Sequence, residues 1–274
     1  MHVSVRGAGP ALVLLHGWAM HGGVFDALAQ RLQDHFTLHI VDLPGHGRSQ
    51  DNTLPLAPAA LADALLEQLP PATWIGWSLG GLVALAAAQR NPGAVHGLGM
   101  LCASPRFVRG EDWPEGMDPA IFDRFADDLA ADYRTAVDRF ILLETYGSDH
   151  AREEIRTLRE IAFQHGEPSI ARLCEGLKVL QDSDLRAGLS GLQMPSLWIA
   201  GRRDRLVTPA AMQRAATACG GEFLEVAHAG HAPFLTHGDV VAAAIVDAAG
   251  GWLGTRATHV AATRVDAARA DVAP

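Results

Sequence analysis

The stretch that decides the fold runs from residue 73 to residue 90 and reads TWIGWSLGGLVALAAAQR. Its first four residues are typical of a short buried strand, and residues 79–90 are typical of a helix. Between them, GWSLG at residues 76–80 places Ser78 in a G-x-S-x-G motif, in the strand–turn–helix setting of a nucleophile elbow. The glycines permit a strained turn, so we expect the Ser78 hydroxyl to lie exposed above a sheet. The alternative, a structural serine in a turn of small residues, is disfavoured by the flanking strand and helix.

Strand-like and helix-like segments alternate on both sides of this motif. Strands are predicted over residues 11–15, 37–41, 73–76, 95–101, 196–200 and 222–226, and helices over residues 24–32, 57–69, 79–90, 209–218 and 240–252. This order predicts an α/β fold with a mostly parallel sheet and helices on both of its faces.

Strand signals are absent from the middle of the chain. Helices are predicted there over residues 119–131, 134–146, 150–164 and 169–180. Because the strand pattern resumes afterwards, we interpret this segment as an all-helical lid inserted into one sheet, although a separate helical domain is an alternative. The predicted division is core 1–104, lid 105–189, core 190–254 and a disordered tail 255–274.

Composition excludes several classes of protein. Of the 274 residues 49% are hydrophobic and 19% are charged, which suits a sizeable core. The formal net charge of −9 argues against binding to nucleic acid. No apolar run reaches the roughly 20 residues that span a bilayer, and no signal peptide is recognisable. Three widely spaced cysteines predict neither a disulfide framework nor a metal site. We expect a soluble, cytoplasmic monomer that does not bind membranes.

A serine nucleophile needs a general base, which should follow an acid late in the chain. Two histidines, His228 and His231, follow the last predicted strand, and either could be the base. His231 is favoured because it lies in the loop that directly precedes the final helix. His228, which is nearer the strand, is interpreted as a structural neighbour.

The acid should lie at the end of the preceding strand, and Asp204 follows the apolar segment 197–200 there. Its carboxylate would fix the tautomer of the imidazole and stabilise the imidazolium. An ion pair with one of the neighbouring arginines, 202, 203 or 205, is the less favoured alternative.

Acyl transfer also requires donors for an oxyanion. The backbone N–H of Leu79, directly after Ser78, is one candidate. The loop after the strand at 11–15 reads His16-Gly17-Trp18, which makes the N–H of Trp18 the second candidate.

Together these motifs resemble the α/β-hydrolase superfamily over about residues 1–254. The residues that carry the resemblance are His16-Gly17, the pattern Asp42-x-Pro44-Gly45-x-Gly47-x-Ser49, Ser78, Asp204 and His231. The resemblance implies the α/β-hydrolase fold with neither a metal nor an organic cofactor. A serine nucleophile argues against the branches that use aspartate, such as haloalkane dehalogenases and epoxide hydrolases.

Within the superfamily, several segments are similar to the pimeloyl-[acyl-carrier protein] methyl ester esterases of biotin synthesis. These segments are LLHGW at 14–18, HFTLHIVDLPG at 35–45, WIGWSLGGLV at 74–83 and AGHAPF at 229–234. The resemblance implies hydrolysis of the methyl ester of a pimeloyl chain carried on acyl-carrier protein.

The resemblance also assigns roles within the lid. It implies that Phe140, Ile141, Leu142, Leu143 and Glu144 line the substrate channel together with Trp18, Ser78 and Leu79. It further implies that Arg134, Arg139, Arg152 and Arg156 dock the acidic carrier protein. Guanidinium groups suit phosphate and carboxylate partners. Residues 133–160 hold five arginines and six acids, however, so ordinary surface ion pairs such as Arg134–Asp138 are the alternative.

Other functions remain open at this stage. A broad carboxylesterase for short acyl esters would not depend on the carrier protein, and substrate profiling would reveal a hydrolase of carbon–carbon bonds. A non-catalytic binder on the same scaffold would fail to react with a fluorophosphonate.

Overall fold

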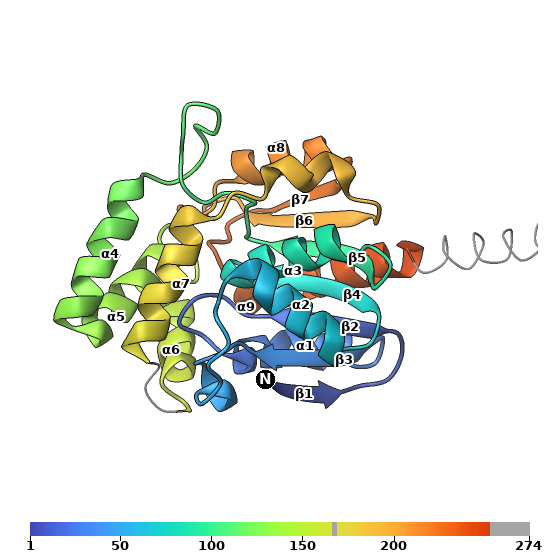
Figure 1. Ribbon diagram of the computed structural model, residues 1–274, viewed down its shortest axis with the longest axis horizontal. Coiled ribbons are helices and arrows are strands. Elements are labelled where there is room, and N and C mark those ends of the chain that lie inside the picture. The colour runs from blue at the N-terminus through green and yellow to red at the C-terminus, as the bar shows by residue number, and fades with distance from the viewer. Residues whose placement is uncertain (166–168, 253–274) are drawn as a thin grey trace, which may run out of the picture.

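The computed structural model describes residues 1–165 and 169–252 (Figure 1). A seven-stranded sheet of order β1-β3-β2-β4-β5-β6-β7 forms its centre. The strands are β1 (His2–Arg6), β2 (Ala11–Leu15), β3 (Thr37–Asp42), β4 (Ala72–Trp77), β5 (Val95–Leu101), β6 (Ser196–Gly201) and β7 (Glu222–Val226). Neighbouring strands are parallel, except that β1 pairs antiparallel with β3. The predicted α/β architecture with a mostly parallel sheet is therefore confirmed.

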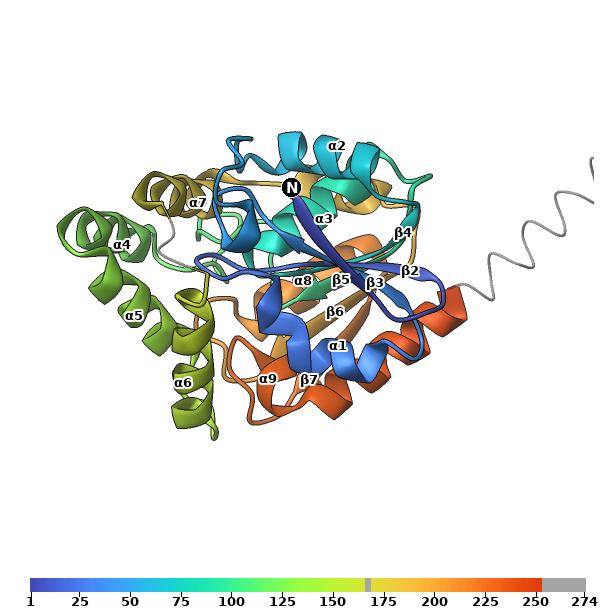
Figure 2. The same ribbon diagram turned by 90° about the horizontal axis from the view of Figure 1, so that it is seen from below.

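Helices cover both faces of this sheet. They are α1 (Asp26–Leu32), α2 (Pro58–Gln68), α3 (Leu79–Arg90), α8 (Pro209–Cys219), the short α9 (Pro233–Thr236) and a helix over residues 238–252. The described part of the chain also contains the 3₁₀ turns η1 (Gly22–Phe25), η2 (Gly47–Ser49) and η3 (Arg186–Gly191). Figure 2 shows α2 and α3 on one face and α1 with the helix 238–252 on the other.

The centre of the sheet explains why its strands are uniformly apolar. Strands β2 and β4 are covered by helices on both faces, so their side chains are buried without the alternation of a one-sided sheet. Helix α3 packs so closely that a Cβ on Gly80 would lie 2.3 Å from the carbonyl oxygen of Leu15. A Cβ on Gly76 would lie 2.2 Å from the carbonyl oxygen of Gly80. Glycine at these two positions therefore brings the start of α3 against the central strands.

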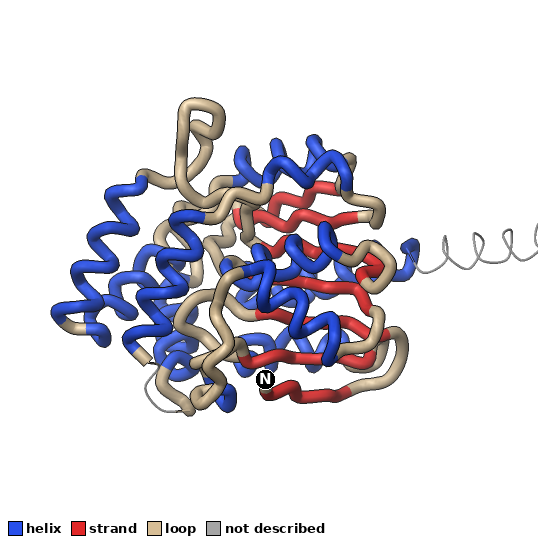
Figure 3. Tube along the Cα trace, in the orientation of Figure 1, coloured by secondary structure: helices blue, strands red, loops and turns tan. Residues whose placement is uncertain are grey.

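Among the described residues between β5 and β6 there are four α-helices, which we call the helical insertion: α4 (Pro119–Ala131), α5 (Tyr133–Glu144), α6 (Ala151–Ala162) and α7 (Ile170–Asp182). Helices and loops alone make up the insertion among the described residues (Figure 3). Local sequence explains two of the helix starts. Asp118 accepts a hydrogen bond from the N–H of Ala120, with Pro119 as the first helical residue, and Asp132 caps α5 in the same way.

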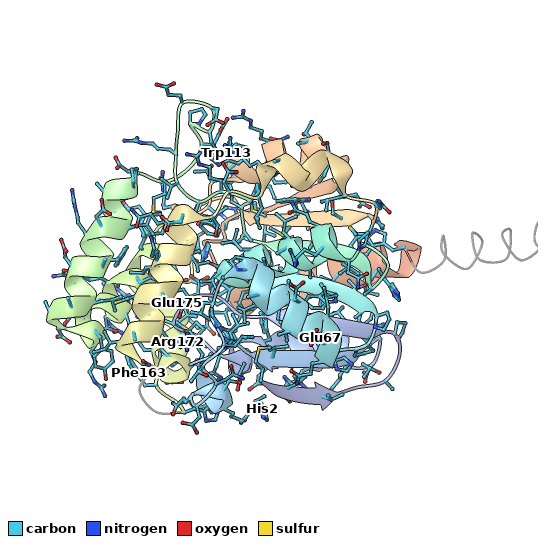
Figure 4. The ribbon with its side chains drawn as sticks, in the orientation of Figure 1. His2, Glu67, Trp113, Phe163, Arg172 and Glu175 are labelled. Carbon is cyan, nitrogen blue, oxygen red and sulfur yellow. The ribbon has the colours of Figure 1, made fainter. Side chains whose placement is uncertain are left out.

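The insertion lies at the end of the sheet where the parallel strands terminate (Figure 1). Helix α7 is tied to the core by Arg172 and Glu175, which Figure 4 labels. Arg172 donates to the carbonyl oxygen of Thr53 at 2.8 Å, and Glu175 accepts from the N–H of Leu56 at 2.8 Å. The indole N–H of Trp18 also donates to the carbonyl oxygen of Leu173 at 2.8 Å. The insertion therefore covers the loops that follow β2 and β3.

Some features were not predicted from the sequence. Strand β1, the 3₁₀ turns and α9 are short, and β1 depends on pairing with β3 for its existence. The helix expected over 134–146 ends at Glu144, and that expected over 150–164 is α6. The division of the chain at residues 104, 189 and 254 stays a prediction, and the expected tail, 255–274, lies outside the described residues. Among the helices described, none combines the length and apolarity needed to cross a bilayer.

Candidate active site

Ser78 lies between β4 and α3 in a strained backbone conformation. Its φ of 53° and ψ of −120° are rare for a residue that carries a side chain. The turn is held by hydrogen bonds from the N–H of Ser78 to the carbonyl oxygen of Leu101 (3.1 Å) and from Gly81 to Ser78 (2.9 Å). The hydroxyl oxygen is buried and has no hydrogen-bond partner among the described residues. The prediction of an exposed hydroxyl is therefore wrong: the turn presents an uncommitted but buried hydroxyl at the end of β4.

Asp204 follows β6 and His231 follows β7, and the fold brings the two side chains into contact. The Nδ1 atom of His231 lies 2.7 Å from Oδ2 of Asp204, and both side chains are buried. The other carboxylate oxygen accepts hydrogen bonds from the backbone N–H groups of Leu206 (2.8 Å) and Val207 (3.0 Å). Because the carboxylate is fixed, Nδ1 of the neutral ring carries the proton and Nε2 is left as an acceptor. Nε2 has no hydrogen-bond partner among the described residues.

The charge state of His231 reflects opposing effects. Burial by itself lowers the pKa of the imidazole, but the charge of Asp204 and its hydrogen bond more than offset burial. Glu144 adds to the increase, so the pKa of His231 lies above its ordinary value. His231 is thus arranged as a base whose protonated form is stabilised.

The structure separates His228 from this arrangement. The His228 side chain is 62% exposed, and its Nδ1 atom lies 3.0 Å from Oδ2 of Asp149. The guanidinium of Arg203 lies 3.2 Å from the same nitrogen. His228 therefore belongs to a surface cluster, and the histidine in contact with Asp204 is His231.

The neighbouring arginines likewise bind elsewhere. Arg203 contacts Asp149, and Arg202 lies 3.6 Å from Glu225. Arg205 lies over the ring of Tyr146 at 5.9 Å. The alternative interpretation of Asp204 as the partner of an adjacent arginine does not fit this geometry.

The loop after β2 lies directly against the elbow. A Cβ on Gly17 would lie 3.2 Å from the Cβ of Ser78, so the absence of a side chain allows the close approach. Within the described residues, the backbone N–H groups of Trp18 and Leu79 donate no hydrogen bond. Leu79 is the first residue of α3, where backbone donors have no partner within the helix. Two backbone donors without a described partner thus lie in the segments next to Ser78, and their role as an oxyanion hole stays a prediction.

His16 supports this loop as a neutral ring. Its Nδ1–H donates to the carbonyl oxygen of Gly17 at 2.8 Å, and Nε2 accepts from the N–H of Leu43 at 2.9 Å. Burial is the main cause that lowers the pKa of His16 to about 3. The ring stays neutral at physiological pH and keeps both hydrogen bonds.

Comparison with known proteins agrees with this geometry. The model of the alpha/beta hydrolase family matches residues 12–244. The chain belongs to this family. It is 57% identical to the pimeloyl-[acyl-carrier protein] methyl ester esterase of Stenotrophomonas maltophilia strain R551-3 over 89% of this chain and 95% of that protein. It is 54% identical to the protein of the same name in Xanthomonas campestris pv. campestris strain B100, over 89% and 97% of the two chains.

Solved structures agree on the fold of this hydrolase. An esterase from Exiguobacterium antarcticum superposes with a TM-score of 0.80 at 22% identity, covering 90% of this chain and 94% of the other. The enol-lactonase of Burkholderia xenovorans LB400 gives 0.78 at 21% identity, with coverage of 90% and 95%. The resemblance predicted from the sequence motifs is confirmed.

The insertion of this α/β hydrolase places one side of α5 against the candidate site. Phe140, Ile141 and Glu144 are buried on the inner side of α5, and the ring of Phe140 lies 4.5 Å from that of Trp18. Leu143 is partly buried, whereas Leu142 is 48% exposed on the outer side of the helix. The predicted channel residues therefore divide into an inner set and the outward Leu142, and the place of all of them in a channel stays a prediction.

All four predicted docking arginines are exposed on α5 and α6. Arg139 pairs with Asp128 at 2.5 Å, and Arg134 lies 5.0 Å from the ring of Phe163, which Figure 4 labels at the lower end of the insertion. Arg152 and Arg156 have no ion-pair partner within the described part of the chain. Asp138, the partner suggested for Arg134, accepts a hydrogen bond from Arg159 at 2.8 Å.

The structure places two further residues beside these groups, of which Cys102 was missed from the sequence. Cys102 follows β5 with a φ of 42°. Its Sγ lies within 4.8 Å of a carboxylate oxygen of Asp204 and of a ring nitrogen of His231. Its position directly after a parallel strand, like that of Asp204, is the signal that could have identified it. Trp77 donates its indole N–H to the carbonyl oxygen of His231 at 2.8 Å, which fixes the histidine loop against the elbow.

The cluster of Cys102, Asp204 and His231 does not suit a metal ion. A thiol binds metals as thiolate, but burial is the main cause that raises the pKa of Cys102 well above its ordinary value. The Asp204 carboxylate already accepts hydrogen bonds from two backbone groups and from His231.

Proposed function

We propose that this α/β hydrolase removes the methyl group from the methyl ester of pimeloyl-[acyl-carrier protein]. The observation that carries the proposal is the identity of 54–57% to esterases of that name over 95–97% of their length. The buried Asp204–His231 pair and the uncommitted Ser78 hydroxyl supply the groups that ester hydrolysis needs.

The proposed reaction has two halves. The Ser78 oxygen attacks the ester carbonyl carbon while Nε2 of His231 takes the hydroxyl proton, and the oxyanion accepts hydrogen bonds from the N–H groups of Trp18 and Leu79. The bond to the methoxy oxygen then breaks, and His231 gives its proton to that oxygen to release methanol. Water attacks the acyl-serine, again with His231 as base, which frees the carboxylic acid and restores Ser78. Asp204 keeps the imidazole oriented and stabilises its charged form throughout.

The helical insertion serves as a lid in this proposal. The Ser78 oxygen and Nε2 of His231 are both buried, so a substrate chain must enter beneath α5 and α7. The apolar inner side of α5, with Phe140 and Ile141, suits the methylene chain of a pimeloyl group. The reacting methyl ester lies at the far end of that chain.

The carrier protein is the proposed macromolecular partner, bound through Arg134, Arg139, Arg152 and Arg156. Arg152 and Arg156 are four residues apart on α6 and so share one face of the helix. They are the strongest docking candidates of the four, because no carboxylate among the described residues forms an ion pair with either of them. We also propose a cytoplasmic location and a monomer for this activity.

The test compares the carrier-linked methyl ester with p-nitrophenyl acetate as substrates of the wild type and of Ser78→Ala. We expect the wild type to release methanol from the carrier-linked ester with a kcat/KM well above that for the small ester. Ser78→Ala should be inactive on both. Restoration of growth of a biotin-requiring strain that lacks this esterase, by the wild type but not by Ser78→Ala, would support the pathway. Equal kcat/KM on both esters would instead indicate a broad carboxylesterase.

A further inference from the structure

Among the described residues of the helical insertion, Glu144 is the one ionisable residue whose side chain faces Nε2 of His231. Its Oε1 lies 3.9 Å from Nε2 of His231, and both side chains are fully buried. Neither carboxyl oxygen has a hydrogen-bond partner in the described part of the chain. The backbone reinforces the contact, because the N–H of His231 donates to the carbonyl oxygen of Glu144 at 3.0 Å. The last turn of α5 is thereby attached to the loop that carries His231.

The position of this carboxyl group matters because of the nitrogen that it faces. Asp204 occupies the Nδ1 side of the ring, so Glu144 and the reacting groups share the Nε2 side. Charges a few ångströms apart interact strongly in a site from which water is excluded. A negative charge on Glu144 stabilises the imidazolium and so opposes the neutral form that accepts the Ser78 proton.

The other titratable groups around the pair come from three further elements. Asp204 after β6 and Glu154 of α6 both disfavour a charge on Glu144, and Cys102 after β5 stays a neutral thiol. Glu154 is engaged by hydrogen bonds from Ser148 and Thr236, each at 3.0 Å. With burial as the largest cause, these surroundings raise the pKa of Glu144 to about 8. Because Glu144 and His231 interact, their titrations belong to the pair.

We propose that Glu144 is a positioning residue that controls the charge state of His231 from the helical insertion. When the pair holds a single proton, that proton lies either on His231, beside an ionised Glu144, or on Glu144, which leaves Nε2 of His231 neutral and productive. Glu144→Gln removes the first, unproductive form. Since Glu144 belongs to α5, any movement of that helix away from the core also removes this carboxyl group from the base. The inference rests on the proposed role of His231 as base, but not on the identity of the ester.

The test measures the pH dependence of kcat/KM for p-nitrophenyl acetate in the wild type, in Glu144→Gln and in Glu154→Gln. Glutamine has nearly the same shape as glutamate but cannot carry a charge. We expect the acidic limb of the profile to move to lower pH by about one unit in Glu144→Gln. Glu154→Gln, which removes another buried carboxyl group from the insertion, should move it much less. The rate of reaction of Ser78 with a fluorophosphonate should show the same displacement.

Glu144→Leu provides a second variant that removes the charge without an amide, and we expect the same direction of shift. The proposal is overturned if the acidic limb keeps its wild-type position in both variants of Glu144. It is also overturned if Glu154→Gln moves the limb as far as Glu144→Gln does. If the limb moves while the carrier-linked methyl ester is not hydrolysed, the proposed substrate is wrong and the role of Glu144 stands. A wild-type protein inert toward both the ester and the fluorophosphonate would overturn the base assignment and this inference together.

Discussion

The core and the helical insertion hold their functional residues in different ways. In the core, Ser78, Asp204 and His231 each follow a parallel strand, and backbone hydrogen bonds fix the turns that carry them. In the insertion, the exposed arginines lie on helix surfaces, and their described ion pairs reach across to other surface residues. The reacting groups therefore depend on the packed sheet, whereas the residues proposed to select the substrate depend on a few helix–core contacts.

The charge distribution follows the same division. Helix α3 is buried from Leu79 to Ala88 without a charged residue, as its contact with the central strands requires. Helix α6 alternates exposed acids and arginines with a narrow buried side that includes Glu154 and Leu158. A change in the core should therefore abolish chemistry or folding, and a change on the insertion surface should alter selectivity.

The largest effect should come from the three core residues that act as one unit. Ser78→Ala and His231→Ala are expected to lower kcat by about 10⁴-fold or more, and Asp204→Asn by a similar factor. His228→Ala should change kcat little, because that side chain contacts Asp149 at the surface. Steady-state kinetics on p-nitrophenyl acetate gives the comparison. An inactive His228→Ala beside an active His231→Ala would show that the base is misassigned.

The next effect compares a glycine of the core with one at the boundary of the insertion. Gly80→Ala should cost about 3 kcal/mol or more of folding free energy, because its methyl group meets the backbone oxygen of Leu15 at 2.3 Å. A methyl group in Gly176→Ala meets a side-chain atom of Trp18 at 2.6 Å instead of a backbone atom, and the substitution should cost less. Gly191→Ala, where a Cβ meets no atom within 4 Å, is the control. Thermal unfolding that ranks Gly176→Ala below Gly80→Ala in stability would contradict the rigid core.

A third test concerns stability as a function of pH at the contact between the two regions. The pKa of Glu144 is about 8 in the folded protein against an ordinary value of 4.5. The unfolded chain therefore loses this proton first, and stability falls as pH rises from about 4.5 through 8. Each pKa unit is worth about 1.4 kcal/mol, so Glu144→Gln should gain at least that much over the wild type between pH 5 and pH 9. Denaturant unfolding of both proteins at pH 5 and pH 9 measures this difference in the free energy of unfolding. If the wild type and Glu144→Gln lose the same stability between the two pH values, Glu144 is not the cause of the pH dependence.

A smaller effect should follow charge reversal on the insertion surface. Arg152→Glu with Arg156→Glu is expected to raise KM for the carrier-linked ester by roughly tenfold, about 1.4 kcal/mol, and to leave p-nitrophenyl acetate nearly unaffected. Added salt should weaken the wild-type preference in the same direction. Equal losses on both substrates would mean that these arginines stabilise the insertion. An unchanged KM would leave them as solvated surface residues and favour a broad carboxylesterase.

The smallest effect should come from a surface ion pair within the insertion. Arg159 and Asp138 are 2.8 Å apart, but both side chains are more than a third exposed. Arg159→Gln should therefore change the free energy of unfolding by less than about 1 kcal/mol and leave kcat unaltered. A larger loss in chemical denaturation would show that α5 and α6 depend on this pair.

The sequence by itself determined the parts of the protein that depend on local patterns. The apolar run before GWSLG and the glycines within it specify the elbow, because a close approach of α3 to β4 leaves no space for a side chain. The strands over residues 11–15 and 95–101 and the helix over 79–90 have the predicted ends. Their apolar periodicity and turn residues act within a few positions of the chain.

Tertiary structure alone decided which distant side chains meet. Strand β1 exists because it pairs with β3, and Cys102 lies beside Asp204 because β5 and β6 are neighbours in the sheet. The sequence resemblance placed Glu144 in a substrate channel, but only the packing of α5 on the histidine loop brings its carboxyl group to Nε2 of His231. The physical reason is that a charge state depends on burial and on neighbours in space, and neither is written in the spacing of residues along one helix.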